Sequence, residues 1–389
     1  FGLSAIAFTS MYYLYMTLII STVFVLSYLF FRRFKFLSNR QFWIQLAVAV
    51  LIAVPFLYIA LRPFISLSDA GGIASRSMEY ASMYSASPTD FFIPSSDHFL
   101  WGKEISQLFD RSLWMEGSLY IGVVGFALTF LALLLNKKSN HRWLIWSGLI
   151  VILVSFVLAL GINLHWNNQV VIAHVPAFLQ PILHRSTTAI YLPDAWLFIH
   201  LPFFDKMRAL MRFGTFALVF VPVLAGLGFN LIQKGLSPHK NTLLSTCFIL
   251  IVFFDFYPGS YAGQLSQPQP RAVDLWLANQ PGEGAVVQMP FIQSTDQAQL
   301  YYTLFYNKPF VGGFFNANQP PQYLNIQSTL DQFPEANSVE LLRKLKVEYI
   351  VVDKNSYSDF SAVQEMCSHL GLIQLTDLEG QAVFTFGGS

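Results

Sequence analysis

Long apolar runs separated by short polar connections dominate the chain up to about residue 257. Six such segments are visible: Leu3–Phe31, Phe42–Phe64, Leu119–Asn136, Trp143–Gly161, Phe213–Ile232 and Thr242–Tyr257. A helix needs roughly 20 apolar residues to cross the hydrocarbon core of a bilayer. Pro55 and Pro222 interrupt two of the segments, which a packed helical bundle tolerates. The pattern therefore predicts a polytopic α-helical membrane bundle of about six spans.

The pattern changes after Pro258, where apolar residues occur only in short runs. Five elements are predicted there: helices at Arg271–Asn279 and Ser338–Leu345, strands at Ala285–Met289 and Val347–Val352, and a closing hairpin from Leu372–Leu375 to Ala382–Phe386. The alternation of helices and strands predicts a small α/β domain. We therefore divide the chain into a transmembrane domain, 1–259, and a soluble domain, 260–389.

Composition places the chain outside the class of soluble proteins. It is 54% hydrophobic and 12% charged, with a mean hydropathy of +0.48, whereas soluble domains are roughly one-quarter charged. Aromatic residues make up 16% of the chain, as suits helices that face lipid and rings that lie at the membrane interfaces. The net charge of +1 gives no reason to expect a nucleic-acid partner.

Charge segregation predicts the orientation. The connections after the first, third and fifth apolar segments carry basic residues and no acids, at 32–40, 137–142 and 234–240. By the positive-inside rule these are cytoplasmic. The loops 65–118 and 162–212 and the soluble domain are then extracytoplasmic, and the predicted location is the inner (plasma) membrane. Because Phe1 opens the sequence inside an apolar run, we expect a piece of a longer chain.

The first long loop holds the candidate catalytic residues Asp90, Asp97 and His98, within SPTDFFIPSSDHFLWG at Ser87–Gly102. Two interpretations are open. The favoured one gives them capping and Asx-turn roles around two prolines, and the other makes one of them a base or a metal-binding carboxylate. Neither the histidine separations in the second loop nor the two cysteines match a metal-binding pattern, so the sequence indicates no cofactor and leaves a divalent metal ion as an open alternative.

Arg208 and Arg212 immediately precede a run that carries no charge until Lys234. On a helix their spacing of four residues places both on one face at the membrane surface. Two guanidinium groups there can bind phosphate oxygens in a planar, bidentate way. The plainer interpretation, which the sequence favours, is that they anchor the helix at the interface.

Three stretches together resemble a known group of proteins: Ser87–Gly102, LPFFDKMRALMRFG at Leu201–Gly214 followed by LAGLG, and SVELLRKLKVEYIVVD at Ser338–Asp353. The chain is similar to bacterial members of the C-type (GT-C) superfamily of glycosyltransferases, which use polyprenyl-phosphate-linked sugars. The resemblance implies a membrane bundle with an extracytoplasmic C-terminal domain, and transfer of a sugar to a glycan, lipid or protein acceptor.

The resemblance also implies roles for individual residues. Arg208 and Arg212 would bind the donor phosphate, and Asp90, Asp97 and His98 would be outer-loop catalytic candidates. In the superfamily the catalytic acid usually follows the first span, which here would lie upstream of Phe1. The alternative function is a non-enzymatic transporter or assembly factor for lipid-linked glycans or cell-envelope polymers. The near absence of charge inside the spans disfavours ion-coupled transport but leaves a scaffold role open.

Overall fold

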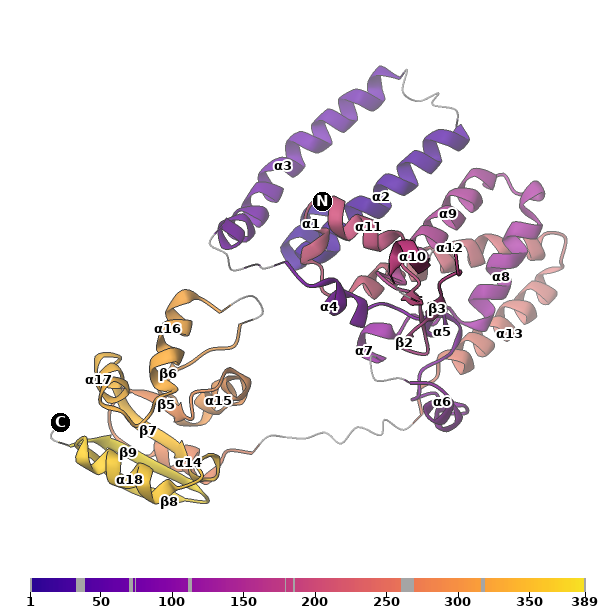
Figure 1. The fold of residues 1–389 in the computed structure, drawn as a ribbon. Coiled ribbons are helices and arrows are strands. Elements are labelled where there is room, and N and C mark those ends of the chain that lie inside the picture. The colour runs from indigo at the N-terminus through magenta and orange to yellow at the C-terminus, as the bar shows by residue number, and fades with distance from the viewer. Residues whose placement is uncertain are drawn as a thin grey trace. The chain divides into compact units, whose positions relative to one another are not determined.

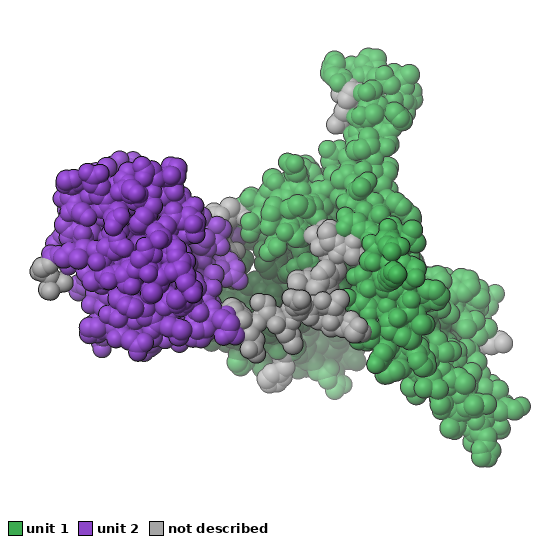
Figure 2. Space-filling view, turned by 90° about the horizontal axis from the view of Figure 1, so that it is seen from below, with its two compact units in different colours: residues 1–67, 75–263 green, residues 68–74, 264–389 purple. Residues whose placement is uncertain are grey.

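The computed structural model describes residues 2–32, 39–69, 73, 75–110, 114–178, 180–184, 186–259, 269–315 and 319–387. These residues form two compact units (Figures 1 and 2). The first comprises residues 1–67 and 75–263, and the second residues 68–74 and 264–389.

The first unit is helical, and its long helices follow the apolar segments of the sequence. They are α1 (Gly2–Thr9), α2 (Met11–Arg32), α3 (Arg40–Asp69), α8 (Val123–Leu134), α9 (Arg142–Ala159), α12 (Gly214–Gln233) and α13 (Pro238–Phe256). Within the part of the chain that the structure describes, five helical segments are long and apolar enough to cross a membrane: Met11–Phe31, Arg40–Asp69, Arg142–Ala159, Leu210–Gln233 and Pro238–Phe256. The expectation of a helical, membrane-type protein is confirmed.

The predicted span at Leu119–Asn136 is wrong in length. Helix α8 has only 12 residues, or about 18 Å at 1.5 Å per residue, against a hydrocarbon core of about 30 Å. The helix begins late because Gly122 has a φ of +77°, in the left-handed region, and a Cβ there would lie 2.7 Å from the Phe256 ring. Residues 118–122 are therefore non-helical.

Helix α12 packs against both α8 and α9, and small residues allow the close approach (Figure 1). A Cβ at Gly228 would lie 2.1 Å from the Leu128 carbonyl oxygen of α8, and one at Gly148 of α9 would meet Leu224 at 2.9 Å. Helix α2 also packs against α9. By contrast, α3 and α13 have no buried residue, which is the pattern of apolar helices that face lipid.

Short elements fill the two long loops. The first loop contains α4 (Met78–Met83), α5 (Pro88–Phe92), α6 (Gly102–Leu108) and α7 (Trp114–Gly117). The second contains two small hairpins, β1 (His165–Trp166) with β2 (Gln169–Val170) and β3 (Ile172–His174) with β4 (Thr187–Ala189), then α10 (Gln180–Leu183), α11 (Pro193–His200), η3 (Phe204–Lys206) and η4 (Leu210–Phe213). Buried Phe91, Phe204 and Phe213 join both loops to the bundle core.

The second unit is built on a five-stranded sheet in the order β6-β5-β7-β9-β8. Its strands are β5 (Ala285–Met289), β6 (Phe310–Val311), β7 (Val347–Asp353), β8 (Leu372–Leu378) and β9 (Gln381–Phe386), and its helices are α14 (Ala272–Ala278), α15 (Gln293–Tyr306), α16 (Pro321–Leu330), α17 (Ala336–Lys344), the short η5 (Lys354–Ser356) and α18 (Phe360–His369). Strand β5 pairs in parallel with both β6 and β7. Strand β9 pairs antiparallel with β7 on one side and with β8 on the other.

Candidate functional site

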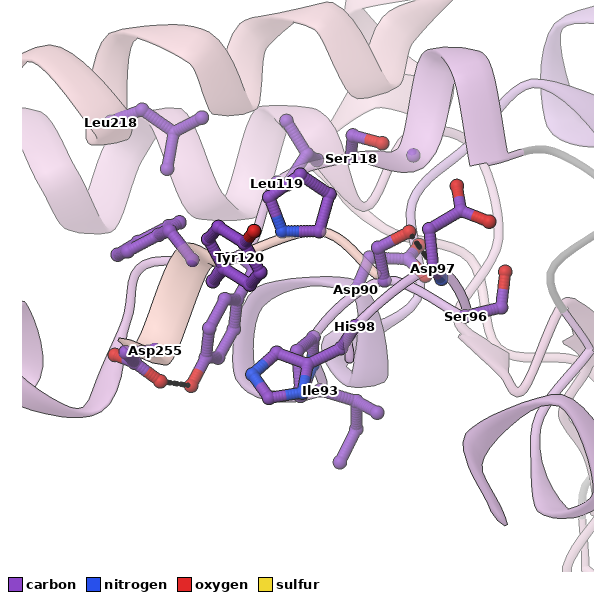
Figure 3. Close-up of a pocket in the computed structure, with 16 residues that line it drawn as sticks. Asp90, Ile93, Ser96, Asp97, His98, Ser118, Leu119, Tyr120, Leu218 and Asp255 are labelled. Atoms are coloured by element: carbon purple, nitrogen blue, oxygen red, sulfur yellow. Dashed lines mark hydrogen bonds between the residues drawn. The ribbon is translucent and has the colours of Figure 1, made fainter. Parts of the chain in front are cut away.

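A pocket of about 330 Å³ lies where the first long loop meets the ends of α8 and α13 (Figure 3). The segment between α5 and α6, the segment between α7 and α8, and the last residues of α13 form its walls, with Leu218 of α12. Its ionisable and hydroxyl side chains are Asp90, Ser95, Ser96, Asp97, His98, Ser118, Tyr120, Asp255 and Tyr257. The structure thus brings all three predicted catalytic candidates of the loop into one pocket.

Asp90 is a buried helix-capping residue. Its Oδ2 accepts a hydrogen bond from the backbone N–H of Ser87 at 2.7 Å, with Pro88 at the first position of α5. A Cβ at Gly117, on the opposite wall, would lie 3.6 Å from the carboxylate carbon. The capping interpretation of the sequence is confirmed for this residue. The lack of a side chain at Gly117 leaves the carboxylate on the pocket wall.

His98 is held in one tautomer by its own turn. Its Nδ1 accepts hydrogen bonds from the backbone N–H groups of Leu100 and Trp101, at 3.2 and 3.3 Å. A nitrogen that accepts two N–H groups carries no proton, so Nε2 is the hydrogen-bond donor of the ring in this arrangement. The buried ring can therefore donate a hydrogen bond through Nε2, but its accepting nitrogen is already used.

The Asp97 carboxylate, in contrast, makes no hydrogen bond or ion pair with any residue that the structure describes. The backbone fixes its position, because its N–H donates to Ser95 Oγ and its carbonyl accepts from Gly259 N–H. In Figure 3 the carboxylate points away from the His98 ring. Of the three predicted candidates, Asp97 is the one whose functional group is not already engaged in the fold.

Asp255 joins the pocket from the last turn of α13, and the sequence analysis did not propose it as a site residue. Its Oδ1 accepts a hydrogen bond from the Tyr120 hydroxyl at 2.7 Å (Figure 3). Its Oδ2 accepts one from the backbone N–H of Val123, also at 2.7 Å. It therefore caps the start of α8 from another helix. The sequence did contain one signal for this role, because Asp255 is a single acidic residue near the end of an apolar segment.

The two arginines do not share a helix face, so that part of the prediction is wrong. Arg208 lies in the non-helical stretch between η3 and η4, Arg212 lies in η4, and α12 begins only at Gly214. The Nε and Nη2 of Arg212 donate to Glu116 Oε2 and Oε1, at 2.7 and 2.5 Å. The Nη2 of Arg208 donates to the Tyr84 hydroxyl at 3.1 Å, and its guanidinium lies 4.7 Å from the centre of that ring.

Glu116 links the two arginines electrostatically. The hydrogen bond from Arg212 lowers the pKa of Glu116 against the opposing effect of burial, and the charges of Arg212 and Arg208 lower it further. Two guanidinium groups and one carboxylate give the cluster Arg208–Glu116–Arg212 a net charge of +1. Neither Glu116 nor Tyr84 was a candidate in the sequence, because both contacts join segments far apart in the chain.

The sequence profile of a domain of unknown function, DUF6311, matches residues 2–227. The chain belongs to this family. No curated protein and no solved structure matches it. The DUF6311 match includes the first long loop, Glu116 and both arginines, and it ends before Asp255 and before residues 264–389 of the second unit.

Within the DUF6311 region, α7 contributes a residue to the arginine cluster and a residue to the pocket wall. Glu116 faces Arg212, and the next residue, Gly117, lines the pocket opposite Asp90. A carboxylate-lined pocket and a cationic cluster are thus one residue apart along the chain. Among the residues of known placement, no group of three or more His, Cys, Asp or Glu side chains is arranged to hold a metal ion.

Proposed function

We propose that the protein is a membrane glycosyltransferase that transfers a sugar from a polyprenyl-phosphate-linked donor to an extracytoplasmic acceptor. One arrangement supports this most: Glu116, on which the charges of both guanidinium groups act, is followed by Gly117, which lines the pocket that also contains Asp97. The resemblance of three stretches of the sequence to polyprenyl-phosphate-dependent glycosyltransferases points in the same direction. Membrane lipid surrounds the helices, and the acceptor is a glycan, lipid or protein.

The pocket residues act on the acceptor, and the two arginines act on the phosphate of the donor. Asp97 takes the proton of the acceptor hydroxyl as its oxygen forms a bond to the anomeric carbon of the donor sugar. The bond from that carbon to the phosphate oxygen breaks, and polyprenyl phosphate leaves with the electron pair. Arg208 and Arg212 stabilise the negative charge of the leaving phosphate. Asp90 and His98 shape the pocket, and His98 Nε2–H donates a hydrogen bond to the acceptor.

The proposed orientation places this chemistry outside the cytoplasm, in the inner (plasma) membrane of a bacterium. The basic connections 32–40, 137–142 and 234–240 lie inside, and the loops 65–118 and 162–212 lie outside. The pocket belongs to the outer side, because residues of the first loop and the end of α13 form it.

The test is sugar transfer by the purified full chain from labelled polyprenyl-phosphate hexoses to a membrane extract. We expect Asp97→Asn to lower the transfer rate about 100-fold or more, the usual loss on removing a general base. Glu104→Gln, an exposed acid on α6, is the matched control and should retain the wild-type rate. Unchanged transfer by Asp97→Asn would show that Asp97 is not the base.

The alternative is a non-enzymatic transporter or assembly factor for lipid-linked glycans or cell-envelope polymers. It is favoured by the structural use of Asp90, Asp255 and His98, whose polar atoms accept hydrogen bonds from their own fold. Binding of polyprenyl phosphate with no transfer of any hexose, under conditions where the protein is folded, would select this alternative.

A further inference from the structure

The guanidinium of Arg212 has one edge in use and one edge open. Five N–H groups surround a guanidinium. Glu116 accepts from Nε and from one N–H of Nη2. The two N–H groups of Nη1 and the second N–H of Nη2 make no bond to any residue of described placement. The Arg212 side chain is 28% exposed, so a ligand outside the fold can contact it.

Arg208 lies on the exposed side of the same cluster. Its guanidinium lies over the Tyr84 ring, 4.7 Å from the ring centre, and one Nη2 N–H donates to the Tyr84 hydroxyl. Its charge acts on Glu116 together with that of Arg212. The two arginines are therefore close to one carboxylate, and one of them is oriented by that carboxylate through two parallel hydrogen bonds.

We propose that Glu116 is a positioning residue: by holding the Nε–Nη2 edge of Arg212, it presents the opposite edge to the phosphate group of a ligand, which the charge of Arg208 also attracts. This inference rests on the proposed function in naming a lipid phosphate, since free inorganic phosphate offers the same oxygens. A planar fork whose orientation is already fixed loses less side-chain entropy when it binds two phosphate oxygens than one that is free to move at the membrane surface.

Charge and orientation predict opposite effects for the removal of Glu116. If only net charge mattered, Glu116→Gln would raise the cluster from +1 to +2 and strengthen anion binding. If Glu116 orients Arg212, the same substitution weakens binding, because glutamine offers one acceptor oxygen where the carboxylate offers two. The direction of the change therefore separates positioning from simple electrostatics.

The experiment measures the Kd of the purified full chain for farnesyl phosphate and, in a second arm, for inorganic phosphate. Wild type, Glu116→Gln, Arg212→Lys and the double variant are compared, with Glu104→Gln as the control for loss of an exposed acid. Thermal unfolding of each variant establishes that it is folded. Preference for farnesyl phosphate over inorganic phosphate identifies a lipid as the source of the phosphate group.

We expect Glu116→Gln to weaken farnesyl phosphate binding about tenfold, and Glu104→Gln to leave it unchanged. In the Arg212→Lys background, Glu116→Gln should cause no further weakening, because lysine has no second edge to orient. A merely structural Glu116 would weaken binding in both backgrounds. Unchanged or tighter binding by Glu116→Gln, wild-type affinity of Arg212→Lys, or no phosphate binding by wild type would each overturn the inference. Phosphate binding without sugar transfer would instead reject the proposed enzyme and leave the role of Glu116 intact.

Discussion

The Asp255 carboxylate and the Tyr120 hydroxyl lie 2.7 Å apart and join the last turn of α13 to the segment that precedes α8. The second carboxylate oxygen accepts from Val123 N–H, one of the N–H groups at the start of α8 that have no partner within the helix. Helix α13 has no buried residue. The polar contacts of Asp255 are therefore an important attachment of this helix to the bundle.

We predict that Asp255→Ala lowers the free energy of unfolding of the membrane unit by about 1–3 kcal/mol, through loss of the cap and of the tyrosine bond. Tyr120→Phe removes one of the two hydrogen bonds to Asp255 and should lower the free energy of unfolding by about 1 kcal/mol. Unfolding of the purified protein in detergent measures both. Asp353→Ala is the control, because that carboxylate caps a turn in the second unit. Equal stability of Asp255→Ala and wild type would contradict the attachment.

The elements that the sequence predicted correctly are those whose cause is local. Strand Ala285–Met289 matches β5 at both ends, and the turn of the β8–β9 hairpin falls at Glu379-Gly380, where both residues have positive φ. Helix α8 was predicted too long because its start depends on Gly122 and on the Phe256 ring from another helix. A contact between segments far apart in the chain cannot be predicted from the apolar residues of one segment.

In the candidate site, too, the features with a local cause were predicted and those that depend on distant segments were not. Asp90 was correctly interpreted as a cap, since Ser87, Pro88 and Asp90 form a local pattern. The partner of Arg212 could not be predicted, because Glu116 lies 96 residues away in the sequence. The roles of Asp90, Asp97, His98, Arg208 and Arg212 in catalysis and phosphate binding stay predictions.

The buried carboxyl of Asp194 predicts a pH-dependent stability. It lies in the first turn of α11 with no exposed surface, and neither oxygen has a hydrogen-bond partner among the residues described. Burial raises its pKa to about 8, against about 3.9 in an unfolded chain. The neutral acid is thus favoured in the fold. Its contribution to stability is fully present below about pH 4 and is lost progressively as the pH rises to about 8.

Asp194→Asn keeps the shape of the side chain and cannot ionise. The stability of this variant relative to wild type should therefore increase from pH 5 to pH 8, by up to about 1.4 kcal/mol per pH unit. Thermal unfolding across this range measures the difference, and Glu104→Gln should show no such trend. A difference that does not change with pH would mean that Asp194 ionises normally in the folded protein.

The second unit has its own core and is predicted to fold alone. Val287, Ile350 and Phe384, from three different strands, are fully buried in one cluster. Residues 269–387, expressed separately, should be soluble and unfold cooperatively. In this fragment, Phe384→Ala should lower the free energy of unfolding by about 3–5 kcal/mol. Phe314→Ala, at a position that is 48% exposed, should cost little. Insolubility of the wild-type fragment would show that this unit folds only with the helical one.

The predicted topology depends most on α8, because this helix is the shortest crossing. Val123, at its start, is bonded to Asp255 at the end of α13, so the two ends lie at one level. Helix α13 has 19 residues and α8 has 12, or about 28 and 18 Å. Helix α8 therefore ends short of the cytoplasmic interface, near Lys137. The long side chain of Lys137 can extend to that interface. The non-helical residues before α8 are tolerated because Leu119 and Gly122 are buried against protein.

Single cysteines test whether α8 crosses. In a background of Cys247→Ala and Cys367→Ala, new cysteines are placed by Ser96→Cys, Ser139→Cys, Asn168→Cys and Ser356→Cys. An impermeant thiol reagent added to intact cells should label the cysteines at 96, 168 and 356. It should label the one at 139 only after the membrane is permeabilised, because the basic residues around it hold that connection in the cytoplasm. If α8 instead turned back without crossing, positions 96 and 139 would be labelled together and position 168 would be protected, since α9 would then carry the second loop to the inner side.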